Sequence, residues 1–148
     1  MLLILAAAFL PHGCTPESCY ENIVSGIKGG FYQTGTGLKI SPDSVSLFGP
    51  GIDSPPLYSK ATGLKEVVFP LNPAEPACSY IFTINGIRDT VTFTYTSFPH
   101  LISRECGYSM FHTLNSCIST GNIIDTIIII NRTIAIPYEE NIRIFLED

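Results

Sequence analysis

Two histidines are the residues of this chain best suited to general acid–base chemistry. The sequence has three, but His12 lies in an apolar leader, which leaves His100 and His112. Cys106 precedes His112 by six positions. On one extended strand that even spacing places both side chains on one face, but about 20 Å apart at roughly 3.3 Å per residue. A Cys–His pair requires hydrogen-bond contact, so the spacing favours burial of Cys106 in a disulfide over a nucleophilic role.

The sequence contains none of the other catalytic patterns that we sought. It has no Gly-x-Ser-x-Gly elbow for a serine nucleophile, no Cys-x-x-Cys for redox chemistry or zinc and no calcium-binding loop. Its carboxylates stand singly except for two pairs near the C-terminus, Glu139 with Glu140 and Glu147 with Asp148, which we interpret as solvated ends. We therefore predict no catalytic residue, no metal site and no cofactor.

The composition limits the classes of partner. The formal net charge is −5 and charged residues make up 14% of the chain, against about 25% in typical soluble domains. A negative field attracts neither nucleic acid nor an anionic membrane surface. Nine Phe and seven Tyr are present without any Trp, which weakens a sugar-stacking interpretation. The 45% hydrophobic content, without a long amphipathic helix pattern, suits a compact sheet protein.

The N-terminus is typical of an exported protein. Residues 1–13 include an apolar run that is shorter than the roughly 20 residues of a membrane span. A small residue directly before Cys14 indicates lipoprotein processing, with lipid attached to Cys14 and residues 14–24 as a tether. Pro11 and His12 depart from the usual residues there, and the alternative is a secreted protein with Cys14 as an ordinary thiol. We expect a cell-envelope protein anchored in the outer membrane, periplasmic or surface-exposed, or secreted if Cys14 is not used.

A β-hairpin is predicted around Asn85 and Gly86. Before the turn Tyr80, Phe82 and Ile84 alternate with residues 81 and 83, an isoleucine and a threonine, and after it Val91, Phe93 and Tyr95 alternate with threonines. Period two with such residues indicates strands. Asn-Gly is the dipeptide best able to supply two positive φ angles in a type I′ turn. Whether residues 87–89 belong to the turn or to the strand stays open.

Short strands are expected along the rest of residues 25–148. Alternation and turn residues place them near residues 26–37, 44–48, 57–58, 66–71, 101–114, 123–136 and 141–146. Prolines confine several of these segments to strand ends or sheet edges. Residues 127–130 are four consecutive isoleucines, which suit a strand covered on both faces. The pattern predicts an antiparallel β-sandwich of seven to nine strands, immunoglobulin-like or related.

The central motifs resemble those of a domain-of-unknown-function family of small Bacteroidetes envelope lipoproteins. Its members show a lipidated cysteine, a second cysteine a few residues later, and Phe-Thr-Tyr before Ser-Arg-x-Cys-Gly-Tyr. The matching positions here are Cys14, Cys19, residues 93–95 and residues 103–108. The resemblance implies an envelope location and a small β domain. It implies no activity and transfers no catalytic residue.

Four cysteines remain if Cys14 carries the lipid, and four cysteines allow three pairings. The resemblance places Cys19 and Cys106 at family-typical positions and implies that they pair. Cys78 and Cys117 are additional to the family pattern, and we predict that they form a second bridge. In the chain-entropy model, closing a loop of such length stabilises the fold by about 4 kcal/mol.

These observations favour a non-enzymatic module over an enzyme. We expect a domain held at the membrane by its N-terminal lipid that binds an envelope protein or glycan through loops of the sandwich, or has a structural role, and that does not bind nucleic acid. The alternative is a small envelope hydrolase that uses His100 or His112 with a nearby acid. That alternative requires one imidazole within hydrogen-bond reach of a nucleophile or carboxylate in a cleft.

Overall fold

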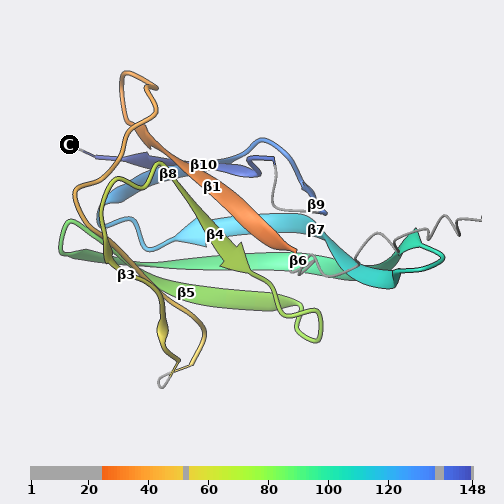
Figure 1. Ribbon diagram of the computed structural model, residues 1–148. Helices are drawn as coiled ribbons and strands as arrows, with labels where there is room; N and C mark the ends of the chain where they lie inside the picture. The colour runs from red at the N-terminus through yellow and green to blue at the C-terminus, as the bar shows by residue number, and fades with distance from the viewer. Residues whose placement is uncertain (1–24, 52–53, 136–138, 148) are drawn as a thin grey trace, which may run out of the picture.

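The chain forms a β-sandwich in the computed structural model, which describes residues 25–51, 54–135 and 139–147. Ten strands lie in these ranges, in two sheets that face each other across one core (Figure 1). This confirms the predicted all-β fold. Among the described residues no helix is long and apolar enough to cross a membrane. The predicted signal peptide (residues 1–13), tether (residues 14–24) and lipidated Cys14 lie outside the described residues and stay predictions.

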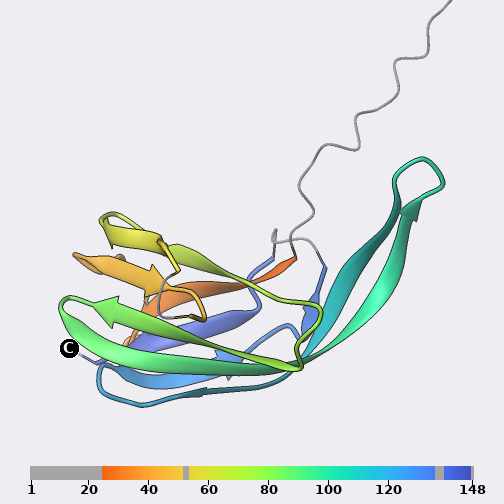
Figure 2. The ribbon, with the colours of Figure 1, turned by 90° about the horizontal axis from the view of Figure 1, so that it is seen from below.

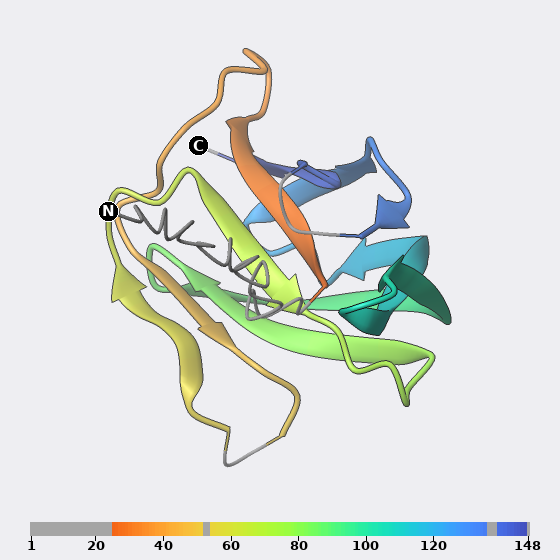
Figure 3. The ribbon, with the colours of Figure 1, turned by 45° about the vertical axis from the view of Figure 1, so that its right-hand side comes forward.

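The strands divide into a sheet of four and a sheet of six. Their bounds are β1 Gly26–Gln33, β2 Val45–Phe48, β3 Pro56–Ala61, β4 Glu66–Pro70, β5 Ala77–Ile84, β6 Ile87–Ser103, β7 Gly107–Ser119, β8 Ile124–Ile129, β9 Thr133–Ile134 and β10 Ile142–Leu146. The orders are β4-β1-β10-β8 and β3-β2-β5-β6-β7-β9, and the smaller sheet lies across the larger one (Figure 3). All paired strands of the described chain are antiparallel except β1 and β10, which are parallel. The count exceeds the seven to nine expected because strands such as β9, with two residues, are too short to show alternation.

The core is built from the inward-facing residues of both sheets. Phe69 of β4 contacts three aromatic rings of the opposite sheet, with ring centroids 5.0 Å from Phe93, 5.4 Å from Tyr80 and 5.8 Å from Phe82. All four side chains are almost completely buried. Edge-on aromatic contacts of this kind add to the free energy gained by removing the rings from water. Phe69 is therefore the residue that joins the two sheets most directly.

The predicted hairpin is present and its turn is tight. Asn85 and Gly86 have φ angles of 49° and 85°, as a type I′ turn requires. Residues 87–89, which the sequence left open, belong to β6. The Asn85 side chain also accepts a hydrogen bond from the Ser44 N–H over 3.0 Å. The turn thus ties the hairpin to the chain that enters β2.

The far ends of β6 and β7 leave the sandwich as a two-stranded ribbon (Figure 2). We call residues 96–111 the arm. β5 pairs with β6 only as far as Thr94, and β9 pairs with β7 only at His112 and Thr113. Within the described chain, the strands of the arm therefore pair only with each other.

Pro99 lies inside β6, where a residue without an N–H could interrupt the hydrogen bonds between strands. The Tyr95 N–H donates to the Pro76 carbonyl, so the backbone groups of alternate residues, Pro99 included, point away from β7. No strand of the described chain pairs with that edge of the arm. The missing N–H of proline therefore interrupts no ladder there.

The isoleucine run is covered on one face only, which corrects the prediction of two-sided burial. β8 is an edge strand of the four-stranded sheet. Ile127 and Ile129 are half-buried and pack against the core, whereas Ile128 and Ile130 are 47% and 45% exposed. The prediction was wrong because each sheet of a two-layer sandwich has one face toward the core and one face toward solvent, and the composition of the run does not reveal how many layers cover it.

Candidate functional site

The arm carries apolar side chains on both faces. Residues directly opposite each other across two antiparallel strands share a face. One face holds the pairs Pro99 with Met110 and Leu101 with Tyr108, and the other face holds Phe98 with Phe111 and His100 with Ser109. Tyr108 is 72% exposed, Leu101 48% and Phe98 37%. The arm thus presents large apolar groups to solvent on a ribbon that has no core of its own.

His100 lies on the arm and stacks on an aromatic ring. Its imidazole is 4.3 Å from the Phe111 ring centroid, with the two planes 12° apart. Phe98 meets the same ring edge-on at 6.4 Å. Among the described residues, no hydrogen bond joins His100 to a nucleophile or a carboxylate. The arrangement makes His100 part of an aromatic cluster on the arm.

His112 lies at the base of the arm and is almost fully buried. Its Nδ1 is 2.8 Å from the hydroxyl oxygen of Ser97, the residue directly opposite it on β6. Burial lowers the pKa of His112, so the imidazole is neutral at neutral pH. The described chain places no carboxylate against either ring nitrogen. One of the two candidate imidazoles therefore reaches a hydroxyl, but without the orienting acid of a catalytic triad.

Cys78 and Cys117 are free thiols, and the predicted bridge between them is wrong. Cys78 of β5 and Cys117 of β7 both lie opposite Phe93 of the intervening strand β6. Neighbouring strands are about 4.8 Å apart, so their Cα atoms are about 9.6 Å apart, beyond the limit of about 7 Å for a disulfide. Burial raises the pKa of both thiols, that of Cys117 to about 12.

Cys106 lies in the turn at the tip of the arm, where its N–H donates to the Ser103 hydroxyl over 3.0 Å. It is not among the free thiols. Its predicted partner Cys19 lies outside the described residues, and so does Cys14. The Cys19–Cys106 pairing therefore stays a prediction.

An apolar recess of about 340 Å³ opens beside Cys78 and Tyr80. Leu57, Pro70 and Leu71 form much of its wall. The volume is at the lower end for small-molecule sites, which are roughly 300–1,000 Å³. The thiol of Cys78 is nearly buried and has a raised pKa, so the recess offers no activated nucleophile.

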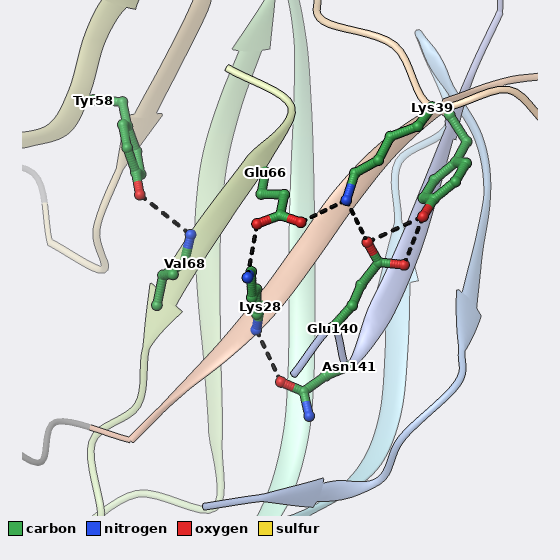
Figure 4. Close-up of polar contacts among 8 residues, drawn as sticks. Lys28, Lys39, Tyr58, Glu66, Val68, Glu140 and Asn141 are labelled. Atoms are coloured by element: carbon green, nitrogen blue, oxygen red, sulfur yellow. Dashed lines mark hydrogen bonds and ion pairs between the residues drawn. The ribbon is translucent and has the colours of Figure 1, made fainter. Parts of the chain in front are cut away.

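A network of charged side chains covers the outer face of the four-stranded sheet (Figure 4), and the sequence did not indicate it. Lys39 lies 2.5 Å from Glu66 and 3.0 Å from Glu140, and Lys28 lies 2.7 Å from Glu66. The Tyr32 hydroxyl donates to Glu140 over 2.8 Å. Glu140 is packed so closely over Gly30 that a Cβ at that position would collide with its carboxylate. The interpretation of Glu140 as a solvated end was therefore wrong, since its side chain is only 15% exposed.

Both carboxylates of this network are held in the ionised form. Burial by itself would raise the pKa of Glu140, but hydrogen bonds from Tyr32 and Lys39 outweigh it and lower the pKa. Hydrogen bonds from Lys28 and Lys39 lower the pKa of Glu66. A general acid needs the opposite shift. The network therefore ties β1, β4 and the chain before β10 together instead of forming an acid–base pair.

Comparison with known proteins places the chain in one family. The model of a family of unknown function, DUF6452, matches residues 44–146. No curated protein matches the chain, and no solved structure does. The match covers nearly the whole sandwich and all of the arm.

Proposed function

Given that this chain belongs to DUF6452, a family of unknown function, we propose that it is a lipid-anchored envelope domain that binds a partner protein through the arm. The sequence favoured loops of the sandwich as the contact surface and left a glycan as an equal candidate. The apolar character of the arm favours a protein, because protein interfaces are enriched in aromatic side chains. A glycan ligand and a purely structural role are then outcomes of the test below.

The observation that carries this proposal is the exposure of Tyr108, Leu101 and Phe98 on a projecting ribbon. An isolated two-stranded hairpin is at best marginally stable in water. Contiguous exposed apolar side chains mark interaction sites on soluble proteins. A partner laid against the face that carries Leu101 and Tyr108 would bury these two side chains and would also stabilise the ribbon.

The first residue that the structure describes lies at the base of the arm. Ser25, the first described residue, donates its hydroxyl to the Met110 carbonyl over 2.7 Å, so the chain from the tether reaches the sandwich at the base of the arm. The apolar leader and the Cys14 context support lipid attachment. If residues 1–24 hold the protein at a membrane, an arm whose base contacts Ser25 is well placed to contact another protein there.

The first prediction concerns partner capture on intact cells that produce the protein natively. With a photo-crosslinking amino acid in place of Tyr108, we expect one specific protein adduct, and Leu101→Ser should reduce its yield about tenfold, since loss of one interface anchor costs about 1–2 kcal/mol. The readout is mass spectrometry of the adduct. The control position for the photo-crosslinking amino acid is Leu38, which is 64% exposed and is not part of the arm.

Equal adducts from positions 108 and 38 would contradict a role of the arm, and a glycan adduct would replace the protein partner. The same cells test the anchor. The protein should fractionate with membranes and Cys14→Ser should release it. Membrane association that survives Cys14→Ser would contradict lipid attachment.

A second candidate function rests on the contact between Ser97 and His112. The neutral imidazole next to a hydroxyl has the parts of a nucleophile–base pair, as a small envelope hydrolase would require. Two observations argue against a hydrolase: His112 is buried, and no carboxylate within the described chain contacts its imidazole. His100 supports this alternative less, because its ring stacks on Phe111.

A fluorophosphonate probe tests the hydrolase alternative directly. Under the leading proposal the purified protein stays unlabelled while a serine hydrolase in the same tube is labelled. Labelling that disappears in Ser97→Ala and persists in Ser109→Ala would establish the alternative. Ser109 is a suitable control because it lies on the arm opposite His100, away from the buried imidazole.

A further inference from the structure

β8 is the last strand of the four-stranded sheet, and its outer edge is open within the described chain (Figure 1). The Ile130 N–H donates to the Asn141 carbonyl over 2.8 Å, so the backbone groups of Ile128, two positions earlier, also point toward β10. The intervening residues Ile127 and Ile129 therefore direct their N–H and C=O groups to the opposite side. No other strand of the described chain pairs with them there.

The other three strands that end the two sheets of the described chain are protected against further pairing. Proteins protect sheet edges with prolines, bulges, very short strands or a covering group. At β4 the outward-pointing Val68 N–H donates to the Tyr58 hydroxyl over 3.3 Å (Figure 4), and the strand ends at Pro70. β3 begins at Pro56, and its register against β2 shifts twice. β9 has only two residues.

β8 has none of these protections. Its six residues include no proline and no basic residue, and Asp125 is its one charged residue. The side chains of Ile128 and Ile130 are 47% and 45% exposed on its outer face. A β-favouring apolar segment without proline at an open edge is an aggregation hazard unless a defined partner covers it. Of the four outermost strands, β8 is therefore the one best suited to pair with a further strand.

We propose that β8 pairs antiparallel with β8 of a second copy of this chain, about a two-fold axis at Ile128, so that the two four-stranded sheets join into one. In this register Ile127 of each copy lies opposite Ile129 of the other, and their outward backbone groups bond to each other. The two Ile128 side chains lie directly opposite each other, at a position where side chains approach closely. A two-fold contact covers both edges at once and leaves neither open.

The charges at the two ends of β8 favour a second copy as the occupant. Asp125 near its start and Arg132 just beyond its end are both exposed. Antiparallel pairing about Ile128 puts Asp125 of each copy opposite Asn131 of the other, next to Arg132. The two Asp125 carboxylates are then separated by about 20 Å along the strands. Edge pairing of this length buries less than the roughly 800 Å² per partner of a standard interface, so we expect a reversible dimer.

Single introduced thiols test the register. Ile128→Cys should oxidise to a disulfide-linked dimer, because Cα atoms opposite each other at such a position are about 4.5 Å apart. Thr126→Cys, on the same face of β8, should give no such dimer, because the two copies of residue 126 would be about 13 Å apart. A mixture of Thr126→Cys and Ile130→Cys proteins should form a mixed dimer, since residue 126 lies opposite residue 130. Mass spectrometry of the linked peptides distinguishes the introduced thiols from the native ones.

Sedimentation equilibrium measures the association of the purified protein without a crosslink. Ile128→Lys should weaken the dimer at least tenfold, because two like charges would then lie directly opposite each other. A mixture of Ile128→Lys and Ile128→Glu proteins should restore association, since the opposed charges are then of opposite sign. The control is Ile118→Lys on β7, at a side chain that is 65% exposed in the other sheet, which should leave the dimer unchanged.

Three results would overturn the proposal. A wild-type protein that stays monomeric up to about 1 mM would exclude a second copy and leave the edge to a strand of another protein. Equal disulfide linkage in Ile128→Cys and Thr126→Cys would contradict the register, and a dimer that persists in Ile128→Lys would place the contact elsewhere. Urea unfolding verifies that each variant is folded. None of these variants changes the arm, so this inference and the proposed function fail separately.

Discussion

Replacing Asp89 with alanine should cost about 3–5 kcal/mol of the free energy of unfolding, because it leaves several buried donors without a partner at about 1–3 kcal/mol each. The carboxylate is 1% exposed and accepts hydrogen bonds of 2.9 Å from the N–H groups of Asn122, Ile123 and Ile124. The Thr120 hydroxyl donates to it as well. Total stabilities are about 5–15 kcal/mol, so urea unfolding of Asp89→Ala should show a large loss. Asp43→Ala, at an exposed carboxylate, is the matched control and should change stability by less than about 0.5 kcal/mol.

The stabilising effect of Asp89 should also depend on pH. Burial by itself would raise the pKa of Asp89, but hydrogen bonds from Thr120 and the three backbone N–H groups outweigh it and lower the pKa below the ordinary 3.8. A lowered folded-state pKa means that the stabilisation is complete above pH 3.8 and is lost as the pH falls through the folded-state value. Stability measured from pH 6 to pH 2 should therefore fall more steeply in the wild type than in Asp89→Asn. Parallel curves would contradict an ionised Asp89.

Replacing Phe69 with alanine should cost about 3–5 kcal/mol, the usual range for a buried aromatic residue. Phe69 is completely buried and contacts Phe93, Tyr80 and Phe82 across the interface between the sheets. The cavity left behind would lie where both sheets meet, and neither sheet can close it without moving the other. Thermal or urea unfolding measures the loss.

The matched variant for this prediction is Phe98→Ala on the arm. Phe98 is 37% exposed and has no core behind it, so its replacement should cost less than about 1 kcal/mol. The two Phe→Ala variants remove the same atoms from different places. Equal losses would show that the arm contributes to the core of the sandwich, contrary to the structure.

Local features of the chain were predictable because neighbouring residues determine them. The turn at Asn85 and Gly86 depends on two residues that tolerate positive φ, and the alternation on either side of it depends on the two-residue period of a strand. The same period in several segments was enough to predict an all-β sandwich. Neither inference needs to know which strands lie side by side.

The positions of the cysteines depended on pairing between distant segments. Cys78 and Cys117 have spacings in the sequence that permit a bridge, but β6 lies between their strands and places Phe93 between the two thiols. Sheet order is a property of the whole fold, and composition does not encode it.

What the sequence determined by itself is the class of structure: short strands, tight turns and an even alternation that needs two facing sheets. The tertiary structure alone decided that Glu140 packs over Gly30, that β8 lies at an edge and that residues 96–111 of β6 and β7 project as the arm. The physical reason is the separation along the chain over which each effect acts. A backbone preference acts over two to four residues, whereas the burial of a side chain depends on which distant strand covers it. The alternation of buried residues in β6 ends at Tyr95, before the arm, where no second sheet is present, and the exposed side chains of the arm carry the proposed function.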